Sequence, residues 1–201
     1  MKIENEKQLR KLYDLPSGRA QAKQLEFLEK HSIHFIEKSP FVVISTYDKN
    51  GKVDASPRGG KPGFVRILGK QEIVIPDSKG NNRIDSLINI VDTGRIGMFF
   101  LIPGVDETLR INGHAYISTE LSLLTLFSTE SNPPKSCIVI KIEEVFLHCA
   151  KALMRSDLWN EKAKIDRSDF PTMGKMLKDQ LGTLGEIESQ EAMLKRYKKD
   201  L

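Results

Sequence analysis

Short β-rich segments follow one another along this chain with connections too short to contain a helix, and this spacing limits the possible folds. Residues 41–47 form a β-branched, aromatic run that is followed by Asp48-Lys49-Asn50-Gly51. Asn-Gly is the strongest short-range signal for a hairpin turn, so residues 52–57 are predicted to return as the partner strand. A parallel doubly wound sheet needs a helix between successive strands. The pattern therefore favours an antiparallel sheet.

Further segments extend this pattern. A second hairpin is predicted across Gly69-Lys70, a buried strand over 95–102, a returning strand over 107–118 and a last long strand over 136–149. Six or seven short strands joined by hairpins, with helices at the corners, are typical of a closed or partly closed antiparallel barrel. No Gly-x-Gly-x-x-Gly follows a strand, which excludes a Rossmann-type dinucleotide site.

The length of 201 residues predicts one domain over 1–201. Apolar residues at helical spacing predict an N-terminal amphipathic helix over about 19–38 and a helical C-terminal extension over about 171–199. Cys137 and Cys149 fit no disulfide or metal pattern, and no histidine has ligand partners at metal-binding spacing. We therefore expect no metal site.

Charge and hydropathy exclude several classes of function. The formal net charge is +4, and Lys and Arg are interleaved with Asp and Glu rather than gathered in basic aromatic stripes, so no nucleic-acid partner is predicted. No stretch approaches the roughly 20 apolar residues of a membrane span. The first residues lack the apolar core of a signal peptide. We expect a cytoplasmic protein with no membrane contact.

Two polar, basic loops carry the chemistry. The first is Asp54-Ala55-Ser56-Pro57-Arg58-Gly59-Gly60, and the second, Pro76-Asp77-Ser78-Lys79-Gly80-Asn81-Asn82-Arg83, leads into an amphipathic helix. Glycines let the backbone approach a ligand, and amide donors with a cation at a helix N-terminus suit a phosphate group. A third basic cluster lies at 151–156. Together these segments indicate a nucleotide-type cofactor.

Ordinary structural roles compete with this interpretation. Asn81 and Asn82 are also typical turn and cap residues, and Trp159 is also suited to packing. A cation at a helix N-terminus is unfavourable unless an anion is present, which favours an anionic ligand beside Arg83. No Ser-His-Asp or Cys-His signature occurs, so covalent catalysis is not indicated.

The order of the motifs resembles a known family. Asp54-Ala55-Ser56-Pro57-Arg58-Gly59 comes first, then Ile75-Pro76-Asp77, then Gly80-Asn81-Asn82-Arg83, and finally the run from His148 to Trp159. In this order they resemble the pyridoxamine 5'-phosphate oxidase-like FMN-binding proteins, over about residues 20–165. The resemblance implies a mainly β fold with peripheral helices (α+β), built as a six-stranded antiparallel split β-barrel that binds FMN.

The resemblance also implies which residues contact FMN. In chain order these are Ala55, Ser56, Pro57, Arg58, Pro76, Asp77, Asn81, Asn82, Arg83 and Arg110. The first four lie where such proteins face the isoalloxazine, and the next two lie where a strand end meets the flavin. The following three lie at the 5'-phosphate, and the last faces the carbonyl edge of the ring. The family builds this site between two subunits of a homodimer, so Lys151, Arg155 and Trp159 are expected from the partner chain.

These features lead to one main hypothesis and two alternatives. The chain is expected to be an FMN-dependent oxidoreductase acting on a small-molecule redox substrate that the sequence does not identify. The oxidase-type Ser-Arg-Lys phosphate loop is replaced by Asn81-Asn82-Arg83, so FMN binding carries over better than vitamin oxidation. A non-catalytic flavin carrier or sensor is the first alternative. A split barrel that binds a deazaflavin or haem is the second.

Overall fold

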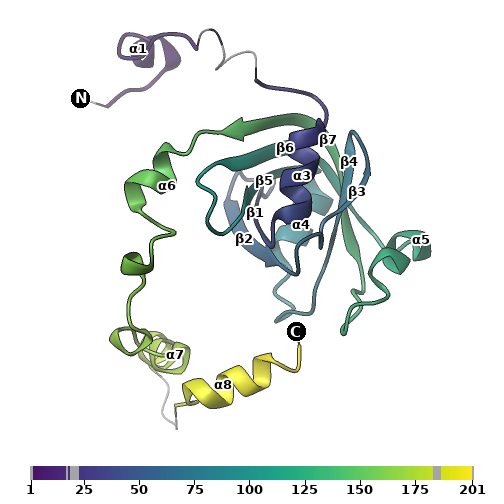
Figure 1. Cartoon of the computed structure of the whole chain (residues 1–201), viewed down its shortest axis with the longest axis vertical. Coiled ribbons are helices and arrows are strands. Elements are labelled where there is room, and N and C mark those ends of the chain that lie inside the picture. Colours follow the sequence, from purple (N-terminus) through teal and green to yellow (C-terminus); the bar gives the residue numbers. More distant parts are fainter. Residues whose placement is uncertain (1, 17, 19–22, 183–186, 201) are drawn as a thin grey trace.

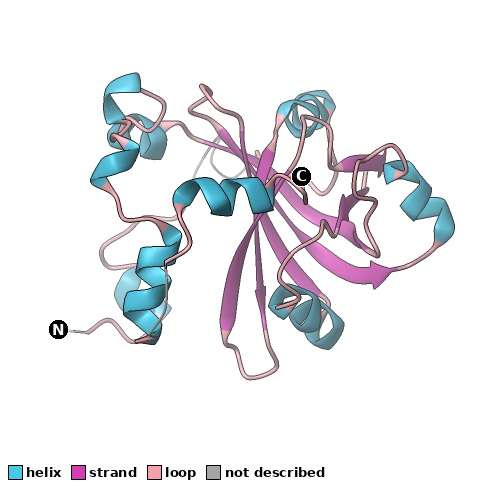
Figure 2. Ribbon diagram, turned by 90° about the horizontal axis from the view of Figure 1, so that it is seen from below, coloured by secondary structure: helices cyan, strands magenta, loops and turns pink. Residues whose placement is uncertain are grey.

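A seven-stranded sheet forms the centre of the protein in a computed structural model, which describes residues 2–16, 18, 23–182 and 187–200. The strand order is β2-β1-β5-β6-β7-β4-β3, and every pairing is antiparallel. The strands are β1 (Phe41–Tyr47), β2 (Val53–Gly59), β3 (Arg66–Gly69), β4 (Glu72–Pro76), β5 (Arg95–Leu101), β6 (Thr108–Ser118) and β7 (Cys137–His148). The strands cross as a twisted fan (Figure 2).

The predicted fold class is confirmed: the protein is an antiparallel sheet with peripheral helices. The sheet has seven strands rather than six because the short β3 pairs with β4 at one edge. It is also open, since β2 and β3 occupy the two ends of the strand order. The predicted hairpin at Asp48 is present, and the Asp48 carboxylate accepts hydrogen bonds from the backbone N–H groups of Asn50 and Lys52.

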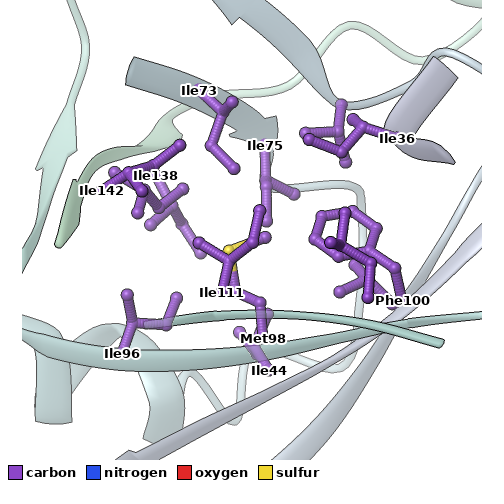
Figure 3. Close-up of a cluster of buried hydrophobic side chains, with 14 of the residues drawn as sticks. Ile36, Ile44, Ile73, Ile75, Ile96, Met98, Phe100, Ile111, Ile138 and Ile142 are labelled. Carbon is purple, nitrogen blue, oxygen red and sulfur yellow. The ribbon is translucent and has the colours of Figure 1, made fainter. Parts of the chain in front are cut away.

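Strand alternation builds the core. In β5, Ile96, Met98 and Phe100 are buried, while the residues between them point to the opposite face. Isoleucine dominates this cluster, and side chains from β1, β4, β5, β6 and β7 meet there with Ile36 of a covering helix (Figure 3). Burial of these branched side chains is the main source of stability for the sheet.

Seven α-helices lie outside the sheet in the described part of the chain. They are α1 (Glu6–Leu9), α3 (Lys30–Lys38), α4 (Asp85–Thr93), α5 (Leu121–Leu124), α6 (Lys151–Ser156), α7 (Met173–Leu181) and α8 (Gln190–Tyr197). Short 3-10 turns lie at Thr125–Phe127, Glu161–Ala163 and Arg167–Asp169. No described helix is both long and apolar enough to cross a membrane.

The N-terminal helix is shorter than the predicted 19–38. It begins at Lys30 because the Glu29 carboxylate caps it. This carboxylate accepts hydrogen bonds from the backbone N–H groups of His31 and Ser32. Upstream, Leu25 leaves helical geometry to exchange two backbone hydrogen bonds with Val145 of β7. Residues 19–22 lie outside the described residues.

The predicted helical extension over 171–199 contains two helices. Gly182, at φ 62°, ends α7, and Ser189 caps α8. We call the described residues 150–182 and 187–200 the C-terminal arm. They extend from the end of β7 beside the sheet, and the last of them lie back near it (Figure 1). The return is fixed by an ion pair between Asp200 and Lys79, 2.5 Å apart.

Candidate functional site

A cavity of about 500 Å³ opens where three elements meet: the strand β2, the end of β4 and the start of α4. This volume is within the range of small-molecule sites. Eight of the predicted cofactor residues line it: Ser56, Pro57, Arg58, Pro76, Asp77, Asn81, Asn82 and Arg83. The first of the two polar segments predicted as loops is therefore strand β2, and it lines the same cavity as the loop between β4 and α4.

The loop between β4 and α4 is held in an unusual backbone conformation. Asn82 and Ile84 have φ values of 62° and 33°. Asparagine tolerates this left-handed region, but a β-branched isoleucine is strained there. The Asn81 side-chain oxygen accepts the Arg83 backbone N–H at 3.0 Å and shapes the turn. Strain of this kind is often stored at ligand sites.

The N-terminus of α4 faces this cavity without a side-chain cap. Ile84 occupies the N-cap position and has no side chain that can accept a hydrogen bond. The first N–H groups of a helix have no partner within the helix, and the helix dipole places positive charge there. Asp85 and Ser86, the first helical residues, both line the cavity. An anion would satisfy these donors.

Two of the charged residues of the cavity, Arg58 and Asp77, are partly buried. Burial lowers the pKa of the Arg58 guanidinium, opposed by the charges of Asp77 and Asp54. Burial likewise raises the pKa of the Asp77 carboxyl, and Arg58 opposes that shift. Arg58 donates from Nη1 to Ser56 Oγ at 2.5 Å and to the Pro57 carbonyl oxygen at 2.9 Å. A charged pair at this depth is typical of functional sites.

The remaining charges of the cavity are paired at its rim. Arg83 Nε donates to Asp85 Oδ2 at 2.6 Å, and this contact raises the pKa of Arg83. Ser86 donates its hydroxyl to Asp54. Lys79 pairs with Asp200, which brings the end of the C-terminal arm to the cavity. Asp54 and Ser86 lie 32 residues apart, so no local motif joins them in the sequence.

Two of the predicted cofactor residues, Arg110 and Ala55, lie on the outer face of the sheet instead of in the cavity. Strand register places Pro57, Val43, Phe99, Arg110 and Phe146 in one row across five strands. The Arg110 guanidinium stacks 3.9 Å from the centre of the Phe146 ring and donates to Glu144 at 2.8 Å. Its buried Nε has no hydrogen-bond partner among the residues that the structure describes. Ala55 lies in the next row. Only Pro57 belongs to both the row and the cavity.

Three predicted residues lie on the C-terminal arm, and none of them lines the cavity of its own chain. Lys151 and Arg155 are exposed on α6, where Arg155 Nε donates to the Lys151 carbonyl oxygen. Trp159 is half-buried, and its indole Nε1 donates to the Val105 carbonyl oxygen at 2.9 Å. The tryptophan thereby joins the arm to the turn between β5 and β6.

The sequence comparison decides the family. Residues 28–149, more than half of the chain, match the family model described as pyridoxamine 5'-phosphate oxidase. The chain belongs to this family. The membership inferred from the motifs is therefore confirmed, and the matched region ends where the C-terminal arm begins. No curated protein sequence matches the chain.

Solved structures of low sequence identity are similar to this chain. The HupZ protein of Group A Streptococcus is 19% identical, with a TM-score of 0.51 over 60% of this chain and 93% of that one. A putative pyridoxamine 5'-phosphate oxidase from Lactobacillus delbrueckii is 17% identical, with a TM-score of 0.49 over 62% of this chain and 98% of its own. At this identity the HupZ comparison supports the fold alone.

Proposed function

We propose that this chain is an FMN-binding flavoprotein that transfers electrons to or from a small-molecule substrate. The observation that carries the proposal is the cavity of about 500 Å³ that joins β2, the end of β4 and the uncapped N-terminus of α4. Membership of the pyridoxamine 5'-phosphate oxidase family supports a flavin rather than an unrelated nucleotide.

The donors at α4 fit the phosphate of FMN. The uncapped start of α4 and the side chains of Asn81, Asn82 and Arg83 all line the cavity. Arginine keeps its charge at any working pH and binds phosphate through two parallel hydrogen bonds. The Asp85 carboxylate holds this guanidinium beside the helix start. The residues present therefore suit a phosphate-bearing ligand.

Arg58 suits the other end of such a ligand. FMN supplies the redox chemistry, and the protein binds it and adjusts its electronics. A fixed cation beside the pyrimidine ring stabilises the negative charge that develops there on reduction. Arg58 is anchored by Ser56 and Pro57, so its guanidinium is preorganised for this role.

We further propose that the working form is a homodimer that pairs through the outer face of the sheet. Val43 and Phe99 are apolar, only partly buried and adjacent in the row that ends at Arg110 and Phe146. A two-fold dimer would cover this row and bring Lys151, Arg155 and Trp159 of each arm toward the other subunit. Light scattering should give twice the mass of the chain. A monomer that retains stoichiometric FMN would contradict this arrangement.

FMN titration tests the phosphate assignment. Arg83→Ala should weaken FMN binding by roughly 1.5–3 kcal/mol, the range for hydrogen bonds to charged groups. Arg10→Ala is the matched control, because Arg10 also forms an exposed ion pair, with Glu6, outside the cavity. Equal FMN affinity in the two variants would exclude the assignment.

Two spectroscopic measurements separate the functional alternatives. The absorbance spectrum of the purified protein distinguishes FMN from a deazaflavin or haem. Anaerobic reduction of the bound flavin by a nicotinamide donor, followed by reoxidation with an electron acceptor, tests turnover. A protein that binds FMN stoichiometrically but never turns over would be a flavin carrier.

A further inference from the structure

The last described residues of the C-terminal arm contact the cavity at one point. Lys79, in the loop between β4 and α4, lines the cavity, and its Nζ donates to Asp200 Oδ1 at 2.5 Å. These two residues are 121 positions apart in the chain. Theirs is the one hydrogen bond or ion pair that joins the described residues 187–200 to the described residues before 150. The end of the arm is therefore tied to a cation of the cavity.

Asp200 belongs to a unit that is held together within the arm itself. Its backbone N–H donates to the Tyr197 carbonyl oxygen at 2.9 Å, so it continues directly from α8. The Arg196 guanidinium donates to both carboxylate oxygens of Glu188, at 3.0 and 2.8 Å. None of these contacts involves Lys79. Loss of the contact to Lys79 would therefore release α8 and Asp200 together.

The two cations of the loop between β4 and α4 have different counter-ions. Arg83 pairs with Asp85, which lies two residues away in the first turn of α4. That carboxylate stays beside Arg83 however the arm moves. Lys79 pairs instead with Asp200, which belongs to the arm. Of these two cations, Lys79 alone can lose its counter-ion through a movement of the arm.

An anionic ligand group and the Asp200 carboxylate need the same ammonium group. Lys79 carries a single positive charge, and a phosphate drawn to it would lie close to the Asp200 carboxylate, so the two anions would repel each other. The Lys79 side chain is 61% exposed and that of Asp200 is 38% exposed. Water can hydrate both groups when they separate, and exposed ion pairs contribute little to stability. A phosphate in the cavity can therefore displace this carboxylate.

We propose that Asp200 is an internal competitor at the cavity: its carboxylate and a phosphate-bearing ligand exclude each other at Lys79. The inference rests on the proposed function for the identity of that ligand, FMN. Binding of the phosphate releases Asp200, and α8 moves away from the cavity with it. The arm thereby responds to whether the cavity holds an anion.

FMN titration tests the competition. Asp200→Asn removes the competing charge and keeps the size of the side chain. At low ionic strength this variant should bind FMN about two- to fivefold more tightly than the unaltered protein, as expected on removal of an exposed ion pair. Asp179→Asn is the matched control, because Asp179 lies on the arm, pairs with Lys175 and does not line the cavity. It changes the net charge equally and should leave the affinity unaltered.

The gain in affinity should require both Lys79 and the phosphate. In a Lys79→Ala background, Asp200→Asn should have no further effect on FMN binding. Riboflavin, which lacks the phosphate, should bind equally to the unaltered protein and to Asp200→Asn. The gain should also vanish at 1 M salt, where the Debye length is about 3 Å. A gain that persists without Lys79, or that riboflavin shares, would overturn the competition.

Hydrogen exchange follows the arm directly. Saturating FMN should speed exchange of the α8 backbone amides in the unaltered protein, because the contact of Asp200 with Lys79 is lost. Asp200→Asn should show the faster exchange without flavin, whereas Asp179→Asn should not. Slower exchange of α8 on FMN binding would mean that the arm closes over the ligand, and it would overturn the proposal.

The outcomes separate this inference from the proposed function. If the unaltered protein binds FMN and Asp200→Asn binds it equally or more weakly, the competition is rejected and FMN binding stands. If neither protein binds FMN, both proposals fail.

Discussion

The sheet and the C-terminal arm belong to one chain but are stabilised in different ways. Every strand pair of the sheet is hydrogen-bonded along its length, and its inner face buries a continuous isoleucine-rich cluster. Among the described residues of the arm, Met193 alone is buried. The arm is linked to the sheet region by Trp159 and Asp200 through polar contacts. Stability is therefore concentrated in the family domain, residues 28–149, and the arm should open at a lower free-energy cost than the sheet.

The largest contrast should appear on truncation of one phenylalanine in each region. Phe100 is fully buried in β5, whereas Phe170 of the arm is 51% exposed. Phe100→Ala should lower the free energy of unfolding by about 3–5 kcal/mol, because it removes a large apolar side chain and leaves a cavity. Phe170→Ala should change it by about 0.5 kcal/mol or less. Urea denaturation measures both. Similar losses in the two variants would show that the arm shares the core's cooperativity.

Two glycines sharpen the comparison. A Cβ on Gly113 would lie 2.1 Å from the Lys141 carbonyl oxygen, and a Cβ on Gly174 of α7 would lie 2.6 Å from the Glu188 carbonyl oxygen. The first clash is inside the β6–β7 ladder, where the backbone cannot move without breaking hydrogen bonds. Gly113→Ala should therefore cost about 1–3 kcal/mol.

Gly174→Ala should behave differently. The atoms that it meets belong to the exposed residues 187–188 of the arm rather than to the β6–β7 ladder, so this segment can shift, and alanine favours the helix by about 1 kcal/mol over glycine, which offsets part of the clash. Its effect on the global unfolding free energy should stay within about 0.5 kcal/mol. Denaturation midpoints for the two variants make the test. A large loss in Gly174→Ala would mean that the arm is packed as rigidly as the sheet.

Local signals in the sequence predicted the sheet but not all element boundaries. The turn at Asp48 and the alternating strands depend on neighbouring residues, and these predictions are confirmed. The start of α3 is different. Helical spacing of apolar residues continued upstream of Lys30, but Leu25 is held by Val145, which is distant in the sequence. Long-range pairing of this kind overrides local helical periodicity.

The candidate site was predictable only in part, because some of its features depend on residues that are distant in the sequence. The polar segments that carry Arg58, in β2, and Arg83, in the loop before α4, are recognisable by composition, and they line one cavity. The pairing of Asp54 with Ser86 and the row that includes Arg110 depend on strand register and tertiary contact. Such features follow from the folded sheet, so a single sequence could not place them.

Trp159 joins the two regions, and its substitution should separate them. Trp159→Phe keeps an aromatic ring but removes the Nε1 hydrogen bond to Val105, a typical loss of about 0.5–1.5 kcal/mol for one hydrogen bond. The sheet does not depend on this bond, so limited proteolysis should cut the arm faster while the family domain stays intact. Unchanged cleavage of the arm would show that another contact holds it.

The smallest expected effect is confined to α8. Hydrogen bonds from Arg196 lower the pKa of the exposed Glu188 carboxyl. Because the folded pKa lies below the ordinary value of 4.5, the stabilising contribution is present above that pH and is lost as pH falls through the folded pKa. NMR titration of the Glu188 side chain should give a midpoint below 4.5, and Arg196→Ala should return it to that value. The α8 backbone signals should shift over the same pH range while those of β5 stay constant. If the signals of β5 moved with Glu188, the arm and the sheet would be one cooperative unit, and the contrast between them would fail.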